Sequence, residues 1–354
     1  MSRPVPLGRV LRRPIANAES LESSALLVGA AVFVVVAIVA ALVFRGSDVP
    51  IAGPGSIGQF VALTAGLTTV VIFVAARSLV TAASDAGRQV DDALTVPGVR
   101  LRWYDVGALA LAHAVIALLG WLGTAALLDR SFTGAVVYPF SAAMLAGVAV
   151  AVTSYAVFLS ALHLTPMLLS LLLVVFLVVG CFASMLSATD PFWWKENLST
   201  LGISNDISAL AFNLTLVIGG VIVTVIAHYA TATIPAEGPR EERGRRFVGG
   251  ALALIGVLLA CVGVLPVDRF FAAHTVAASG MAVIFVILAV GISRFVPSMP
   301  RVFVLLGYVF VGVIGVLAIL FLTGYYNLTA VELIAFLLIF SWLIVFLRNA
   351  NTRA

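Results

Sequence analysis

The sequence predicts an all-α integral membrane protein, a polytopic bundle of about ten transmembrane helices with both termini in the cytoplasm (N-in/C-in). The chain of 354 residues is 62% hydrophobic and only 10% charged, whereas soluble domains are about 45 to 50% apolar and about 25% charged. Its apolar runs reach roughly 20 residues, which suffices for a helix to cross about 30 Å of hydrocarbon. These runs lack the alternation of a lipid-facing strand, which excludes a membrane barrel.

Ten spans are expected from the apolar windows. The first follows Arg9, Arg12 and Arg13 as a secretory signal would, but its apolar run is too long for a signal and no small-residue cleavage site follows closely, so it is expected to stay in the membrane. In chain order the spans are Ser24 to Phe44, Gly58 to Leu79, Val106 to Leu128, Val136 to His163, Met167 to Ser187, Ile207 to Ala230, Phe247 to Val267, Phe271 to Ser293, Val302 to Thr323 and Thr329 to Leu347.

The basic residues orient these spans. With the N-terminus inside, sixteen of the twenty Lys and Arg residues fall in cytoplasmic segments, and the opposite side holds only Arg45, Arg130, Lys195 and Arg269. Cytoplasmic loops are enriched in Lys and Arg, so both termini are expected in the cytoplasm of a cell with a plasma or inner membrane. The scarcity of Lys beside abundant Ala, Val and Arg suggests a bacterial source.

The charge and the cysteines exclude several functional classes. The net charge of +4 is explained by arginines beside anionic lipid head groups, so membrane lipids are the expected partners and nucleic acid is not. Cys181 and Cys261 lie inside spans without metal or redox spacing. No cofactor is expected.

Two charged segments divide the chain. Residues 77–105 and 234–246 contain Pro, Gly and clustered charges, which predicts a solvated linker and a cytoplasmic loop. The expected organisation is residues 1–105 with the N-terminal tail, two spans and the linker, residues 106–166 with two more spans, and residues 167–354 as a six-span membrane domain. The first four spans are expected to form one module and the last six another.

Polar side chains gather at the outer ends of the last six spans, where a shallow outward-facing pocket is expected. Ionisable groups inside a span cost about 2.5 to 3.5 kcal/mol at the membrane centre and by default mark function. His113, by contrast, lies in the inner half of its span. The candidate pocket residues are Asp190, Trp193, Trp194, Lys195, Glu196, Asn197, Ser199, Asn213, Asp268, Arg269, His274 and Glu332.

This polar cluster has several possible interpretations. These groups can simply cap helix ends and pair at the interface. A metal-dependent hydrolase would need more convergent ligands than one outer His and scattered carboxylates, and a proton relay would need acids through the membrane middle. Ser199 lies in no G-x-S-x-G motif and has no His at a diagnostic spacing. A lipid-head-group site fits best, with interfacial tryptophans and the donors of Lys195 and Arg269.

Two short motifs lie in the same region. ENLSTLG at residues 196–202 is followed by Phe212 and Asn213, and GVLP at residues 263–266 is followed by His274. In these motifs the chain resembles, over about residues 167–347, the bacterial membrane family catalogued as domain of unknown function 998, which is distantly like the eukaryotic Frag, DRAM and Sfk group. The bacterial family has no agreed activity, and only its eukaryotic relatives are linked to lipid organisation, lipid-anchor remodelling and kinase regulation at membranes, so the resemblance carries over no catalytic residue.

The sequence therefore predicts a non-enzymatic protein of the cell envelope that binds or organises lipid, or that scaffolds an assembly with other membrane proteins. One alternative is a transporter or flippase-like carrier of a lipid or small amphiphile, which would need a cavity reaching toward His113. Another is a membrane-embedded lipid-modifying enzyme, for which His274 should lie near at least two carboxylates.

Overall fold

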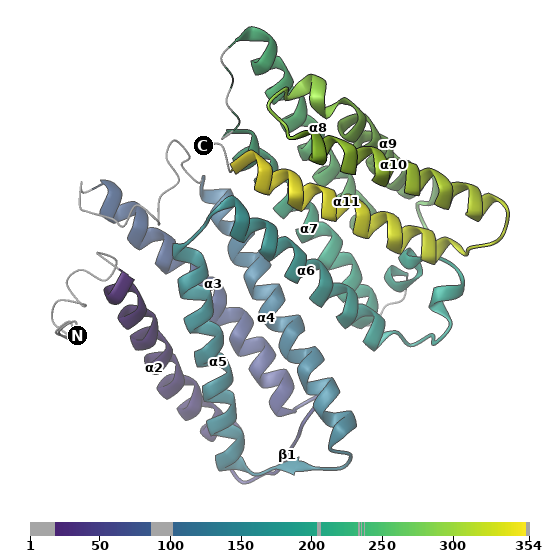
Figure 1. Cartoon of the computed structure of the whole chain (residues 1–354). Coiled ribbons are helices and arrows are strands. Elements are labelled where there is room, and N and C mark those ends of the chain that lie inside the picture. The colour runs from purple at the N-terminus through teal and green to yellow at the C-terminus, as the bar shows by residue number, and fades with distance from the viewer. Residues whose placement is uncertain are drawn as a thin grey trace. The chain divides into compact units, whose positions relative to one another are not determined.

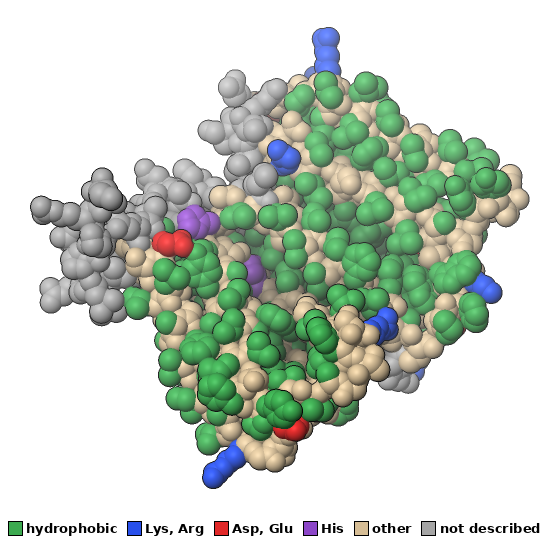
Figure 2. Space-filling view, turned by 60° about the horizontal axis from the view of Figure 1, so that its bottom comes forward, with side chains coloured by type: hydrophobic (Ala, Val, Ile, Leu, Met, Phe, Trp, Pro, Cys, Tyr) green, Lys and Arg blue, Asp and Glu red, His purple; other side chains and the backbone are tan. Residues whose placement is uncertain are grey.

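The computed structural model describes residues 18–85, 102–203, 207–232, 234, 236 and 238–351. Within this part of the chain it is an all-α helix bundle with ten helices that are long and apolar enough to cross a membrane (Figure 1). The predicted fold class is confirmed, and the chain is a multi-pass membrane protein. Hydrophobic side chains cover most of the described surface visible in Figure 2, and large ones such as Leu67 are 71% exposed, as expected for a surface that faces lipid.

The chain divides into two compact units after Thr165. In the first unit, α5 packs against both α2 and α3, and α3 packs against α4. The expected boundary between residues 105 and 106 falls inside this unit, in the first turn of α4. The described helices of the first unit are α2 (Ala18–Val43), α3 (Ile57–Asp85), α4 (Trp103–Ser131) and α5 (Pro139–Leu162).

The fourth span was predicted to begin at Val136, which is too early. Val136 and Val137 form strand β2 (Val136–Val137), which pairs antiparallel with β1 (Val49–Pro50) so that Val49 faces Val137. Helix α5 begins only at Pro139. Proline is favoured at the first helical position because its missing N–H would have no partner there, and this residue therefore sets the boundary.

The predicted linker over residues 77–105 was also wrong at both of its ends. Helix α3 continues to Asp85, and Asp105 is a buried residue in the first turn of α4, only 4% exposed. Its Oδ2 atom accepts the Arg102 backbone N–H at 3.0 Å, as part of a capping box. The remainder of the linker, residues 86–101, lies outside the described residues.

His113 is buried in the first unit with both ring nitrogens engaged. Nδ1 lies 2.7 Å from the Leu109 carbonyl oxygen, and Nε2 lies 2.9 Å from Ser160 Oγ on α5. The Phe73 ring packs against the imidazole with centroids 4.8 Å apart. The polar atoms of this intramembrane histidine therefore link α4 to α5.

In the second unit, residues 166–354, the described residues form six α-helices. Each packs against the next in sequence, and α11 also packs against α6. Two short 3-10 helices, η2 (Trp193–Lys195) and η3 (Leu198–Gly202), lie in the connection between α6 and α7. The six helices are α6 (Pro166–Ser187), α7 (Ile207–Ala232), α8 (Pro239–Val264), α9 (Phe271–Phe295), α10 (Arg301–Leu322) and α11 (Leu328–Asn351).

Helix α8 begins earlier than its apolar run. The charged residues of 234–246 were predicted to form a loop, but the helix already starts at Pro239. Glu242 explains the extension, because its carboxylate pairs with Arg245 at 2.6 Å and with Arg246 at 2.8 Å, one turn further along. Such i,i+3 and i,i+4 pairs support a helix outside the hydrocarbon, so hydropathy located only the membrane portion of α8.

Candidate functional site

Residues of three helices, α7, α9 and α11, form hydrogen bonds with η3 in the loop between α6 and α7. The Leu198 N–H donates to Glu332 Oε2 of α11 at 2.6 Å. Ser199 Oγ lies 2.9 Å from His274 Nε2 of α9, and Asn213 Nδ2 of α7 donates to the Gly202 carbonyl at 3.0 Å. We call these three contacts the η3 clamp.

The hydrogen bonds of His274 fix its tautomer. Nδ1 lies 2.7 Å from the Leu265 carbonyl oxygen, and since a carbonyl can only accept, Nδ1 carries the hydrogen. In the neutral ring Nε2 then accepts from the Ser199 hydroxyl. The side chain is only 5% exposed, so the clamp satisfies both nitrogens of a buried imidazole.

The neighbouring η2 carries an exposed cation on aromatic rings. Lys195 Nζ lies 4.3 Å from the centroid of the Phe192 ring and 5.8 Å from that of Trp194. Phe192 is 57% exposed and Trp194 47%. The Trp194 carbonyl accepts a hydrogen bond from Asn327 Nδ2 at 2.9 Å, while Asp190 Oδ1 accepts the Phe192 N–H at 2.8 Å. We call Phe192, Trp194 and Lys195 the aromatic–cation platform.

The remaining predicted residues are less closely tied to the clamp. Trp193 is half-buried and Glu196 is exposed, with Glu196 Oε2 3.4 Å from Thr200 Oγ1. Asn197 Oδ1 is buried and has no hydrogen-bond partner among the described residues. Asp268 and Arg269 pair with each other at 3.9 Å in the connection between α8 and α9.

Asn213, His274 and Glu332 thus all contact the same loop. Each forms its hydrogen bond with the loop, and none of the three bonds to another of the three. His274 is held by Ser199 and a carbonyl, not by the two carboxylates that the enzyme alternative required. In the described part of the chain, no group of three or more His, Cys, Asp and Glu side chains is placed to hold a metal ion.

Two contacts were missed from sequence. Ser199 and His274 are 75 residues apart, so no local spacing could reveal their pairing. Asn327 was not among the predicted site residues, although it had a detectable signal. Its Oδ1 accepts the Ala330 N–H at 3.0 Å, as an asparagine before a helix does, and this cap also orients its amide toward Trp194.

Comparison with family models, with curated proteins and with solved structures finds no match to this chain.

Proposed function

We propose that the second unit binds the head groups of membrane lipids at the aromatic–cation platform, and so organises lipid or attaches a membrane assembly without catalysing a reaction. The observation that carries the proposal is the exposed Lys195 ammonium resting on Phe192 and Trp194. Tryptophan prefers the membrane interface, and an ammonium over aromatic rings is held there by about 0.5–1 kcal/mol. A phosphate at the same depth would meet a positioned positive charge.

The η3 clamp supports this proposal because it fixes the adjacent platform. A loop held in one conformation before binding loses less entropy when the ligand arrives. The buried polar groups Glu332 and His274 are engaged inside the protein, so the exposed cations are the groups left for a ligand. Arg269 is a second exposed cation, 68% exposed and followed by the exposed Phe270, although its guanidinium also lies 3.9 Å from the Asp268 carboxylate.

The test is lipid retention in nanodiscs of phosphatidylglycerol and phosphatidylcholine. Native mass spectrometry of the wild-type chain is expected to show retained phosphatidylglycerol, and Lys195→Ala is expected to reduce it about fivefold, since one basic residue near an anionic surface contributes about 1 kcal/mol. Lys195→Arg should keep retention. Arg45→Ala, an exposed cation of the first unit, is the matched control. Wild-type retention by Lys195→Ala would refute the proposal.

The carrier alternative finds less support in the contacts. A carrier was expected to have a continuous cavity reaching past the midplane toward His113, but both nitrogens of that side chain are engaged by Leu109 and Ser160 within the first unit. A group that already closes a helix contact is poorly suited to line a path that must open and close. The lipid-binding proposal therefore stands ahead of the carrier.

One observation favours a second candidate, a lipid-modifying enzyme. In the Ser199–His274–Leu265 arrangement, the serine hydroxyl stands where a nucleophile would, the imidazole where its base would, and the Leu265 carbonyl oxygen where the group that orients the base would. Ser199 Oγ would attack an ester carbonyl while His274 Nε2 takes its proton and passes it to the leaving alcohol. Water would then cleave the acyl-serine. Against this candidate, His113 and Ser160 show the same pairing inside the first unit, where it joins helices.

Labelling by a fluorophosphonate separates the two candidates, because this probe modifies only an activated serine. If the lipid-binding proposal holds, the wild-type chain in detergent is expected to remain unlabelled. Strong labelling that Ser199→Ala and His274→Ala abolish would establish the enzyme instead. Ser160→Ala is the control for the similar pair of the first unit.

A further inference from the structure

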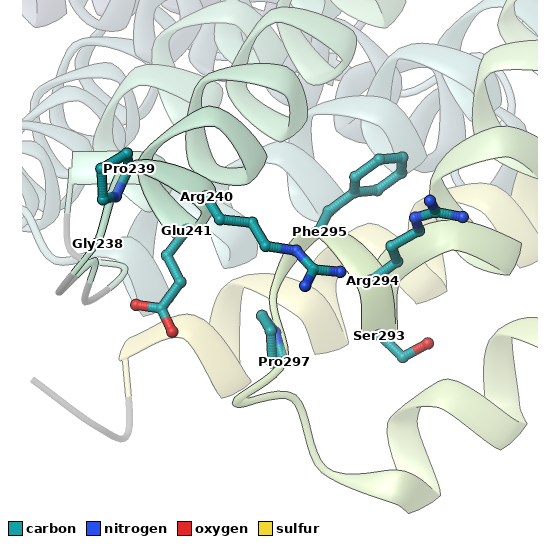
Figure 3. Close-up of a pocket in the computed structure, with 8 residues that line it drawn as sticks. All are labelled: Gly238, Pro239, Arg240, Glu241, Ser293, Arg294, Phe295 and Pro297. Carbon is teal, nitrogen blue, oxygen red and sulfur yellow. The ribbon is translucent and has the colours of Figure 1, made fainter.

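A second region of the second unit carries unpaired charge around a cavity. The cavity, of about 510 Å³, lies between the first turn of α8 and the last turn of α9 (Figure 3). This end of the unit is opposite to the η3 clamp, because α8 ends and α9 begins near Leu265 and His274. The cavity is lined by Gly238, Pro239, Arg240, Glu241, Ser293, Arg294, Phe295 and Pro297.

Close packing between α8 and α9 fixes the walls of the cavity. Gly244 touches the backbone of Phe295 so closely that a Cβ at this position would overlap the Phe295 carbonyl. The Phe247 and Phe295 rings pack with centroids 4.3 Å apart. The chain leaves α9 directly afterwards, with the Val296 N–H donating to the Ile292 carbonyl at 2.8 Å. The two helix ends are therefore held together beside the cavity.

Two arginines of this cavity lack the partners that their neighbours have. Arg245 and Arg246 pair with Glu242, and Arg243 Nε donates to the Pro239 carbonyl at 3.2 Å. Within the described residues, Arg240 and Arg294 form no ion pair or hydrogen bond. Figure 3 shows the Arg240 guanidinium extending across the cavity toward the side where Arg294 lies, while the Glu241 carboxylate points away from both.

We propose that this cavity binds a phosphate group, that of an anionic lipid head group or free phosphate, between Arg240 and Arg294. Guanidinium groups bind phosphate through paired N–H donors, and an anion in the cavity would be attracted by both of the positive charges that line it. The volume lies within the range of small-ligand sites. Phe295 and Pro297 add an apolar wall suited to the first carbons of a lipid's acyl chains.

Isothermal titration of the full chain in detergent, at fixed ionic strength, tests this proposal. The probes are inorganic phosphate, dihexanoyl phosphatidic acid and, as the zwitterionic reference, dihexanoyl phosphatidylcholine. The wild-type chain is expected to bind inorganic phosphate, dihexanoyl phosphatidic acid or both more tightly than the zwitterionic reference. Tighter binding of the lipid than of phosphate identifies a lipid site, and equal affinities identify a phosphate site.

The variants decide whether the cavity is responsible. Arg240→Gln and Arg294→Gln are each expected to weaken binding about tenfold or more, as the loss of a charged hydrogen bond does. Arg301→Gln, which removes an exposed arginine at the start of α10 that does not line the cavity, should leave affinity unchanged. Unchanged binding by both cavity variants, or an equal loss in Arg301→Gln, would overturn the proposal.

Discussion

Replacing Gly256 by Leu is expected to lower the free energy of unfolding by about 3 kcal/mol or more, because it forces a side chain into a closed helix contact. A Cβ at Gly256 would lie 2.5 Å from the Gly220 carbonyl oxygen and 2.9 Å from the Thr224 backbone nitrogen. Backbone atoms cannot rotate away as a flexible side chain can, so α7 and α8 would have to separate. Thermal unfolding of the purified chain in detergent measures the effect.

Gly250→Leu is the matched control on the same helix. Gly250 is exposed, and a Cβ there meets nothing within 4 Å. The two variants share the change in helix propensity, which favours Leu over Gly by less than about 1 kcal/mol. Gly250→Leu should therefore unfold at or slightly above the wild-type temperature. Equal melting temperatures for the two variants would show that α7 and α8 are not in close contact at Gly256.

Replacing Glu332 by Ala is expected to release the η3 clamp and to destabilise the loop by about 2 kcal/mol, the cost of leaving a buried N–H without its acceptor. The Leu198 N–H loses its acceptor, and Leu198 itself is only 8% exposed. Hydrogen exchange at the Leu198 amide should accelerate about 30-fold, since each 1.4 kcal/mol is a factor of ten. Mass spectrometry of peptides covering η3 measures this rate.

Two further variants separate the hydrogen bond from the charge. Glu332→Gln keeps an oxygen that can accept from Leu198 and should slow exchange back toward the wild-type rate. Glu196→Ala removes an exposed carboxylate whose contact with Thr200 is 3.4 Å long, and it should change little. If Glu332→Ala exchanged at the wild-type rate, Glu332 would not hold the loop.

Much of the fold was predictable because the membrane imposes one strong rule, that apolar runs of sufficient length become helices. The errors lie where other forces set the boundary. Pro139 shortens α5 behind a two-residue strand, and the Glu242 ion pairs lengthen α8 into a charged segment. Hydropathy does not register either effect.

The sequence indicated which residues belong to the candidate site, but not their hydrogen-bond partners. The arginine distribution and the helix count predict that Asn213, His274 and Glu332 lie at one membrane depth, and in the structure each of the three forms a hydrogen bond with η3. Asn213 bonds to a backbone group 11 residues away, His274 to a serine 75 residues away, and Glu332 to a backbone group 134 residues away. Such pairings depend on which faces of the helices meet, and an isolated sequence does not specify those faces.

The contacts of α11 with both α10 and α6 give the second unit the topology of a ring. Six helices joined end to end start and finish at the same end of the unit, so the beginning of α6 and the end of α11 are neighbours. Domains with adjacent termini tolerate circular permutation. In such a permutant a linker would join the end of α11 to the beginning of α6, and the chain would be cut in another loop. Every helix would keep its neighbours, so the packing of the unit does not depend on the order of its helices in the sequence.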